Sequence, residues 1–197
     1  MKENKVIGIT GGVGSGKSTV SKILEEDYGA YIINTDDVAH KLMEKGQISY
    51  NYIKEYFGPS ILDENDNIDR AKLGVIVYKD ANELLKLNSF THPYVMDQVK
   101  IIIKQKQKEN YNYVAIETAL PQEAKLKDIC DEIWFVYASQ ASRAKRLKAQ
   151  RNYTDEKIIC IMDKQLTSEE YKAYSTHIII NENGEKLKEQ IEKILGT

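Results

Sequence analysis

The chain has 197 residues, of which 42% are hydrophobic and 29% are charged, and its formal net charge is -2. This charge gives no overall attraction to nucleic acid or to an anionic membrane, and Cys130 and Cys160 lack the paired spacing of a zinc site or redox motif. Because no apolar run reaches membrane-spanning length and the start of the chain has no signal-like stretch, we expect a compact cytoplasmic protein.

Short apolar runs rich in β-branched and aromatic residues alternate with helix-length segments along the chain. The strands predicted from these runs are 5–10, 31–33, 113–116, 133–137 and 177–180. The predicted helical segments are 18–28, the long stretch 38–110 with four or five helical patterns, 123–129, 139–151, 154–164 and 185–195. This alternation predicts an α/β fold with a five-stranded parallel sheet covered on both faces.

A glycine-rich segment follows the first predicted strand and precedes the first predicted helix. Residues 11–18 read GGVGSGKS, a complete G-x-x-x-x-G-K-[ST] phosphate loop. Its glycines can adopt positive φ and let the backbone approach phosphate closely, and Lys17 is placed to bind the β and γ phosphates. Free N–H groups and the helix dipole favour an anion there, and the Ser18 hydroxyl suits Mg²⁺. We therefore expect the chain to bind a nucleoside triphosphate.

Two aspartates follow the second predicted strand, in the segment Asn34-Thr35-Asp36-Asp37. In a parallel sheet, ligands bind outside the carboxyl ends of the strands. A carboxylate at this point could hold a water of the Mg²⁺ shell or accept a proton from an attacking hydroxyl. We favour Asp36 for this role, with Asp37 as the competitor. Either aspartate could instead cap the helix that is expected to begin near Val38.

Several motifs occur in an order that resembles the dephospho-coenzyme A kinase family. They are GITGGVGSGKS, IINTDDVAH, FGPSILDENDNIDRAKLG, the THP of 91–93, DEIWFVYAS, an arginine-bearing region that ends in Gln165, and an Ile-Asn-Glu-Asn-Gly stretch. The resemblance runs from about residue 5 to residue 190. It implies a P-loop kinase that transfers the γ-phosphoryl group of ATP to the ribose 3′-hydroxyl of dephospho-coenzyme A, the last step of coenzyme A biosynthesis.

The resemblance also implies a three-layer P-loop fold in a single chain. Its core would comprise about 1–37, 111–138 and 175–197, with a helical acceptor-binding insert at about 38–110 and a helical lid at about 139–170. The phosphate-binding residues that it implies are Gly12, Val13, Gly14, Ser15, Gly16, Lys17, Ser18 and Thr19.

Further roles are carried over from the family residue by residue. Asp36 would be the catalytic aspartate, and Lys17 and the lid arginine Arg146 would stabilise the transferred phosphoryl group. Adenine would lie near Asn181, although Asn181, Asn183 and Gly184 equally suit a plain turn into the last helix. The acceptor side would be lined by Asp36, His40, Arg70, His92 and Glu117. Ser18 would be the metal ligand, with ATP and Mg²⁺ as cofactors.

The chain departs from the family pattern at three places. Asn34 stands where the family has its first aspartate, and residues 117–123 read ETALPQE in place of an acidic residue followed by Pro-Leu-Leu-Phe-Glu. In the lid, the family typically has two arginines four residues apart, whereas Arg146 and Arg151 are five apart here, with Arg143 nearby, and Ile161 stands where a later arginine is expected. Arg143 and Arg146 could equally form a solvent-facing helix stripe.

Three other functions fit parts of the sequence. The first is a P-loop kinase for another small hydroxyl acceptor, such as a nucleoside, nucleotide or sugar. The second is a nucleotide-dependent binding module without kinase activity, and the third is a homologue that binds coenzyme A species but turns over poorly. For the dephospho-coenzyme A kinase that the resemblance implies, we expect a small-molecule substrate, no nucleic-acid or membrane partner, and a monomer or weak homo-oligomer.

Overall fold

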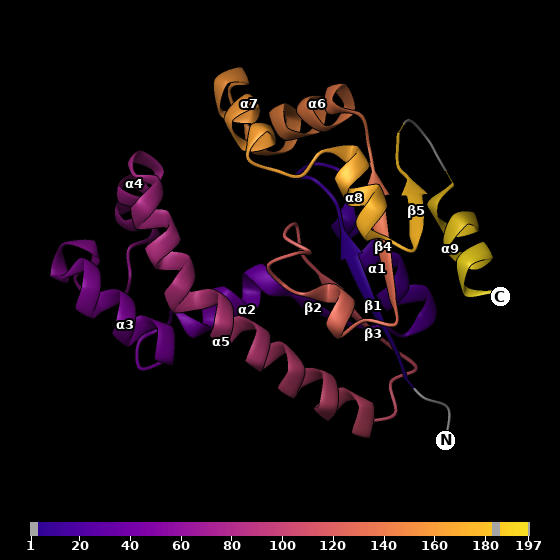
Figure 1. The fold of residues 1–197 in the computed structure, drawn as a ribbon, viewed down its shortest axis with the longest axis horizontal. Coiled ribbons are helices and arrows are strands. Elements are labelled where there is room, and N and C mark those ends of the chain that lie inside the picture. The colour runs from indigo at the N-terminus through magenta and orange to yellow at the C-terminus, as the bar shows by residue number, and fades with distance from the viewer. Residues whose placement is uncertain (1–3, 183–185, 197) are drawn as a thin grey trace. The chain divides into compact units, whose positions relative to one another are not determined.

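The computed structural model describes residues 4–182 and 186–196, and within them five strands form one parallel sheet (Figure 1). The strand order is β2-β3-β1-β4-β5. The strands are β1 (Lys5–Thr10), β2 (Tyr31–Asn34), β3 (Tyr113–Glu117), β4 (Glu132–Tyr137) and β5 (His177–Ile180). The five strands predicted from the sequence are therefore confirmed.

The most buried strand, β1, lies at the centre of the sheet. It pairs in parallel with β3, where Ile7 lies opposite Ala115, and with β4, where Ile9 lies opposite Trp134. Because the strands are parallel, their carboxyl ends meet at one edge of the sheet, the edge at which such folds bind ligands. The loop after β1 is thus placed at the middle of that edge.

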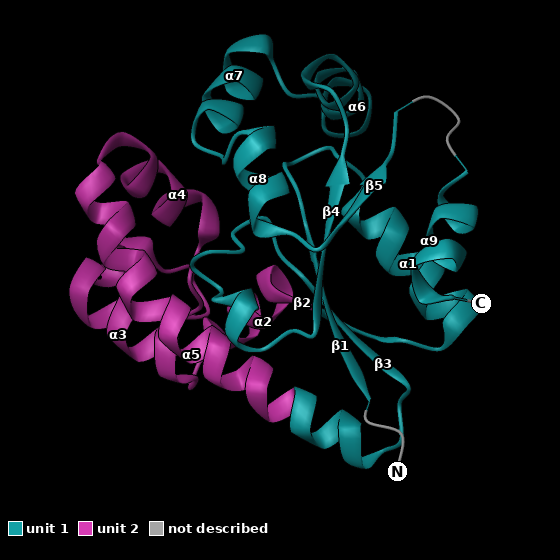
Figure 2. Cartoon of the chain, turned by 45° about the vertical axis from the view of Figure 1, so that its right-hand side comes forward, with its two compact units in different colours: residues 1–33, 103–197 teal, residues 34–102 magenta. Residues whose placement is uncertain are grey.

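Helices cover both faces of the sheet, as the alternating pattern predicted (Figure 2). On one face, α1 (Lys17–Tyr28) and α9 (Leu187–Leu195) pack on a cluster of buried apolar residues that includes Trp134. On the other, Tyr171 of α8 (Ser168–Tyr174) stacks on Phe135, with ring centroids 5.1 Å apart. Successive side chains of a strand point to opposite faces of the sheet, so Trp134 packs against the helices on one face and Phe135 against the helix on the other.

Three helices of the carboxyl-terminal half begin with a side-chain cap. The Ser139 hydroxyl caps α6 (Gln140–Arg151), and the Thr154 hydroxyl caps α7 (Asp155–Asp163). Helix α8, which was not predicted, begins with a capping box between Thr167 and Glu170. That box is visible in the sequence as Thr-Ser-Glu-Glu, a signal that would have located the helix.

The prediction of a helix at 123–129 is wrong. Only a short 3₁₀ helix, Leu126–Asp128, forms there, because Lys125 takes a positive φ of 47°. Leu126 is fully buried, and its Cδ1 lies only 2.9 Å from where a Cβ on Gly8 would be. Packing of Leu126 onto the bare backbone of β1 therefore outweighs the local helical preference.

The chain divides into two compact units, residues 1–33 with 103–197 and residues 34–102 (Figure 2). The second unit contains α2 (Thr35–Leu42), α3 (Ile48–Phe57), the 3₁₀ helix Pro59–Ile61, α4 (Arg70–Lys79) and most of α5 (Ala81–Lys108). Its own core is built on Tyr50, Ile53, Ile61, Leu62 and Leu73. Of the helices described, none combines the length and apolar character needed to cross a membrane.

Candidate active site

The loop between β1 and α1 has the backbone that its glycines predict. Gly14 and Gly16 take φ values of 81° and 97°, a region that residues with a Cβ rarely adopt. A Cβ on Gly16 would also lie 2.0 Å from the Asn181 amide nitrogen, which donates a hydrogen bond of 2.8 Å to the Ser15 carbonyl. Asn181 therefore fixes the middle of the loop. Its predicted contact with adenine stays a prediction, and Asn183 and Gly184 lie outside the described residues.

The ammonium group of Lys17 folds back along the loop. Its Nζ donates to the carbonyl oxygens of Gly11 at 2.9 Å and Gly12 at 3.4 Å. A lysine at this position of a phosphate loop reaches the β and γ phosphates. The position of Lys17 therefore indicates that the terminal phosphate would bind at the Gly11–Gly12 end of the loop.

A buried carboxylate stands behind the predicted metal ligand. Glu117, at the carboxyl end of β3, is 7% exposed and accepts hydrogen bonds from the hydroxyls of Ser18 at 2.8 Å and Ser21 at 2.7 Å. Because the Ser18 hydroxyl donates its proton to Glu117, its oxygen lone pairs remain for a cation. This oxygen donor set suits Mg²⁺, which takes few protein ligands and completes its shell with water and substrate phosphates.

The described residues hold no group of three or more acidic, cysteine or histidine side chains that could bind a metal by itself. A Mg²⁺ ion at Ser18 would thus depend on the nucleotide. Glu117 was predicted to bind the acceptor, and that role stays a prediction. Its contacts with Ser18 and Ser21, both on α1, favour a role beside the metal.

Replacing Glu117 by glutamine is expected to raise the Mg²⁺ concentration needed for half-maximal activity by roughly tenfold or more, because outer-shell partners orient metal ligands. An amide of the same size cannot accept from both serines at once. Titration of ADP release against Mg²⁺ at fixed ATP measures the effect. Glu123→Gln, at an exposed position in the loop that follows β3, is the control and should leave the titration unchanged. An unaltered Mg²⁺ requirement in Glu117→Gln would contradict this role.

The predicted lid arginine Arg146 is engaged by backbone oxygens. Its guanidinium donates to the carbonyls of Gly14 at 3.3 Å, Ser15 at 3.2 Å, Asn181 at 2.7 Å and Glu182 at 2.6 Å. It therefore joins the phosphate loop to the segment after β5. Direct contact between Arg146 and the transferred phosphoryl group stays a prediction.

The Glu182 carboxylate fastens the same segment to the start of α6. It accepts hydrogen bonds from the Ser139 backbone N–H and from the Ser142 hydroxyl, the latter at 2.6 Å. The hydrogen bond from Ser142 is the main cause that lowers the pKa of Glu182. Glu182 was missed by the sequence reasoning, because the contact joins residues about 40 positions apart.

Arg143 was considered as part of a solvent-facing stripe, and that interpretation is wrong for this residue. It is 8% exposed and lies on the phosphate loop, where its Nε donates to the Val13 carbonyl at 2.9 Å. Burial lowers the pKa of its guanidinium, which nevertheless stays charged. Gln165, not among the predicted site residues, meets Arg143 there.

The predicted acceptor-side residues other than Glu117 all belong to the second unit. Asp36 and Asp37 are exposed in the first turn of α2, His40 is half-buried in its last turn, exposed Arg70 begins α4, and half-buried His92 lies in α5. The alternative that an aspartate caps α2 is wrong. The helix begins at Thr35, earlier than expected, and the Asn34 side chain caps it by accepting from the Asp36 N–H at 2.9 Å.

This capping bond explains how the chain tolerates an amide at position 34. Asparagine and aspartate are about equally good at the position before a helix, because each offers one side-chain oxygen to the free N–H groups. Asn34 therefore holds the backbone of Asp36 as an aspartate would. The cap therefore does not use the side-chain carboxylate of either Asp36 or Asp37.

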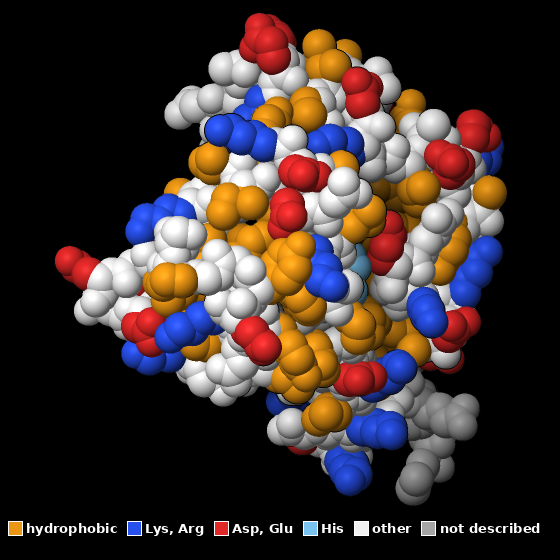
Figure 3. Space-filling view, turned by 60° about the vertical axis from the view of Figure 1, so that its left-hand side comes forward, with side chains coloured by type: hydrophobic (Ala, Val, Ile, Leu, Met, Phe, Trp, Pro, Cys, Tyr) orange, Lys and Arg blue, Asp and Glu red, His pale blue; other side chains and the backbone are white. Residues whose placement is uncertain are grey.

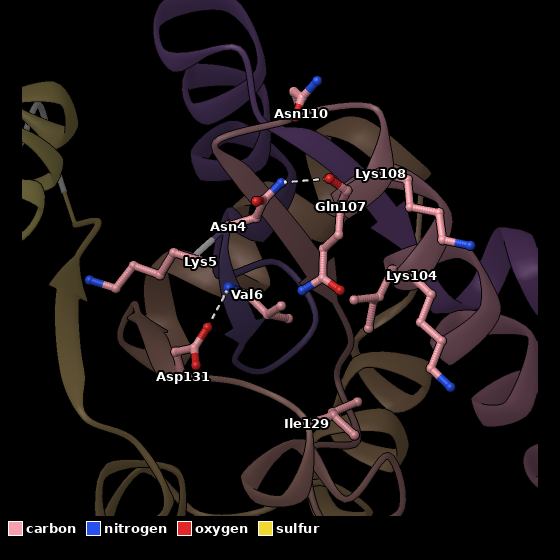
Figure 4. Close-up of a pocket in the computed structure, with 10 residues that line it drawn as sticks. Asn4, Lys5, Val6, Lys104, Gln107, Lys108, Asn110, Ile129 and Asp131 are labelled. Atoms are coloured by element: carbon pink, nitrogen blue, oxygen red, sulfur yellow. Dashed lines mark hydrogen bonds between the residues drawn. The ribbon is translucent and has the colours of Figure 1, made fainter. Parts of the chain in front are cut away.

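A cavity of about 1130 Å³ lies at the opposite end of β1, against Asn4, Lys5 and Val6 (Figure 4). Asp131, which also lines it, accepts a hydrogen bond from the Val6 N–H at 2.7 Å. Because this cavity is at the amino end of β1, it is separate from the phosphate loop.

On the face drawn in Figure 3, acidic and basic side chains are mixed rather than gathered by sign.

The fold and the loop define the class of protein. A parallel sheet with a G-x-x-x-x-G-K-[ST] loop after its central strand, a lysine folded along the loop and a serine backed by a buried carboxylate are features of the P-loop nucleotide-binding proteins, a class that includes kinases, ATPases and GTPases.

Comparison with known proteins narrows this class. The family model described as "Dephospho-CoA kinase" matches residues 5–187. The dephospho-CoA kinase of Carboxydothermus hydrogenoformans is 38% identical over 192 residues, which is 96% of this chain and 92% of the relative. The chain belongs to the dephospho-CoA kinase family, and the resemblance drawn from its motifs is confirmed.

Solved structures share the fold. The structure of TT1252 from Thermus thermophilus superposes with a TM-score of 0.82 at 25% identity, covering 98% of this chain and 97% of that one. A dephospho-CoA kinase from Campylobacter jejuni gives a TM-score of 0.71 at 23% identity, covering 97% and 95% of the two chains.

Proposed function

We propose that this protein transfers the γ-phosphoryl group of ATP to the 3′-hydroxyl of the ribose of dephospho-coenzyme A, giving coenzyme A and ADP as the last step of coenzyme A biosynthesis. The observation that carries the proposal is the family match over residues 5–187, together with the intact phosphate loop inside that match. The reaction breaks the bond between the γ-phosphorus and the β–γ bridging oxygen, and forms one to the ribose oxygen.

The donor half of the site supports this reaction through charge and position. Lys17 and the N–H groups of the loop would hold the phosphates, and Ser18 with Glu117 behind it would hold Mg²⁺. When bound, Mg²⁺ supplies neutralisation of charge on the β and γ phosphates. Because phosphoryl transfer depends mainly on alignment and electrostatics, these groups would supply much of the catalysis.

Asp36 is the group we assign to the acceptor hydroxyl. It lies two residues after Asn34, the last residue of β2, and its backbone N–H is held by the Asn34 cap. Its carboxylate would accept the proton that the ribose hydroxyl loses on attack, a modest contribution by a general base. His40, Arg70 and His92 would bind other parts of the acceptor. Arg70 is suited to a phosphate, since a guanidinium forms paired hydrogen bonds with it.

The cofactors, the compartment and the oligomeric state of the enzyme follow from the same proposal. ATP and Mg²⁺ are its cofactors, and it works in the cytoplasm as a monomer or weak homo-oligomer. Closure of the segment 139–170 over the nucleotide would exclude water that could otherwise hydrolyse ATP.

A coupled assay of ADP release tests the function directly. The protein is supplied with Mg-ATP and, in separate reactions, with dephospho-coenzyme A, adenosine, a nucleoside monophosphate and shikimate. We expect turnover with dephospho-coenzyme A alone, and mass spectrometry of the product should show one added phosphate on the ribose. Turnover with a different acceptor would identify a kinase of another substrate. ATP binding without turnover of any acceptor would identify a non-catalytic homologue, and either result would overturn the proposal.

A further inference from the structure

Residues 118–121, here called the β3 loop, leave the sheet at the edge where such folds bind ligands. The strand order places β3 between β1, which ends in the phosphate loop, and β2, whose carboxyl end leads to Asp36. The β3 loop is also the segment in which the chain departs from the family pattern, with Ala119, Leu120 and Pro121 in it. Its conformation therefore has to be set by this chain's own contacts.

Two tyrosines of α8 hold the backbone of the β3 loop. The Tyr171 hydroxyl donates to the Ala119 carbonyl at 2.8 Å, and the Tyr174 hydroxyl donates to the Pro121 carbonyl at 3.0 Å. The tyrosines are three residues apart, so they lie on one face of the helix. One helix face thus grips two alternate carbonyl groups of the loop.

The same contacts leave Leu120 pointing away from the protein. Its backbone N–H donates to the Thr118 hydroxyl at 3.1 Å, and the Thr118 N–H donates to the Ile9 carbonyl at 3.0 Å. Thr118 and Pro121 are buried, whereas Leu120 is 41% exposed. The backbone on both sides of Leu120 is therefore fixed while its apolar side chain remains accessible at the ligand-binding edge.

The core explains the contact of Tyr171 but not that of Tyr174. Tyr171 is 1% exposed and stacks on Phe135, and burial raises the pKa of its phenol to about 12. A buried hydroxyl needs an acceptor, and the Ala119 carbonyl supplies it. Tyr174 is half-buried, so water could serve its hydroxyl instead. Its bond to Pro121 is therefore best explained by what it does for the loop.

We propose that Tyr174, together with Tyr171, is a positioning residue that holds the β3 loop so that Leu120 forms an apolar contact with the acceptor. The inference rests on the proposed function and concerns acceptor binding in that reaction. Of the parts of dephospho-coenzyme A, the methyl-bearing pantetheine arm suits leucine. The ribose, the phosphates and the edge of adenine need hydrogen-bond partners, which a leucine side chain lacks.

Steady-state kinetics separates this role from a general effect on structure. Leu120→Ala is expected to raise KM for dephospho-coenzyme A roughly tenfold, because apolar surface in contact with the acceptor is lost. Tyr174→Phe keeps the ring and removes only the hydroxyl, and it should raise the same KM by about threefold to tenfold. In both variants kcat and KM for ATP should stay within about twofold, since the lost contact is equal in the ground and transition states.

Tyr111→Phe is the control for the loss of a hydroxyl. Tyr111 precedes the amino end of β3, where its ring packs edge-on against Tyr31, so this variant should leave every kinetic constant unchanged.

The double variant tests whether Tyr174 acts through Leu120. If it does, Tyr174→Phe should add little to KM once Leu120 is alanine, because neighbouring residues that share one contact are not additive. Hydrogen–deuterium exchange without substrates gives a second measure. The segment 118–124 should exchange faster in Tyr174→Phe than in the unaltered protein, because a contact that holds it is lost.

Three kinetic outcomes would overturn the proposal. They are an unchanged KM for dephospho-coenzyme A in either single variant, an equal rise in KM for ATP, and effects that multiply in full in the double variant. Unchanged exchange in Tyr174→Phe would also contradict it. Failure of dephospho-coenzyme A as a substrate of the unaltered protein would overturn the proposed function and the contact with the arm. The exchange measurement would still decide whether Tyr174 holds the loop.

Discussion

Replacing Lys17 by alanine is expected to lower kcat/KM for ATP by more than about 1000-fold, because the positive charge that a phosphate-loop lysine places between the β and γ phosphates is lost. The Nζ of Lys17 already lies along the loop, bonded to the carbonyls of Gly11 and Gly12. Release of ADP at varied ATP, with dephospho-coenzyme A in excess, measures the loss.

The control for this variant is Lys22→Ala, which removes the same charge from the exposed side of α1, where Lys22 only pairs with Glu26 at the surface. That substitution should leave kcat/KM within about twofold, as expected for a surface ion pair. If Lys17→Ala kept a tenth of the activity or more, the loop could not be the site of the transferred phosphate.

Replacing Asp36 by asparagine is expected to lower kcat by about 100-fold, at the lower end of the range for loss of a positioned general base, as befits the modest contribution of a base to phosphoryl transfer. The substitution keeps the size of the side chain and leaves the Asn34 cap intact, because that cap uses the Asp36 backbone N–H. Single-turnover measurement of phosphoryl transfer isolates the chemical step. The affinity for Mg-ATP should stay within about twofold of the unaltered protein.

Asp37→Asn provides the matched comparison for Asp36. Both aspartates are exposed in the first turn of α2, so the two substitutions change the charge at that helix end equally. A general effect of charge on the helix would appear in both variants. If kcat fell in Asp37→Asn and not in Asp36→Asn, the two roles would be exchanged.

Much of the fold could be predicted because its signals are local. Each strand is a short run of β-branched or aromatic residues, and the three central strands β3, β1 and β4 are buried on both faces, so the runs stand out from the helical segments. The phosphate loop was found for a similar reason. Gly14 and Gly16 need positive φ, and few residues other than glycine meet that demand.

The failures in the sequence reasoning have two sources, long-range packing and local capping signals that were passed over. Residues 123–129 look helical by themselves, but burial of Leu126 against Gly8 sets their backbone instead. Asn34 seemed a departure at a catalytic motif, whereas the structure gives it a local task as the cap of α2. The capping box at Thr167 and Glu170 was a local signal, and helix α8 could have been predicted from it.

The sequence by itself determined that this chain is a P-loop kinase of the dephospho-coenzyme A kinase family, since the loop, the strands and the ordered motifs are all patterns along the chain. Only the tertiary structure decided how α6 uses its arginines. Arg143 and Arg146 are equivalent in sequence, three residues apart on one helix, yet one lies on Gly12 and the other bonds Gly14 and Ser15. The reason is geometric, because each contact depends on where α6 packs against a loop about 130 residues away.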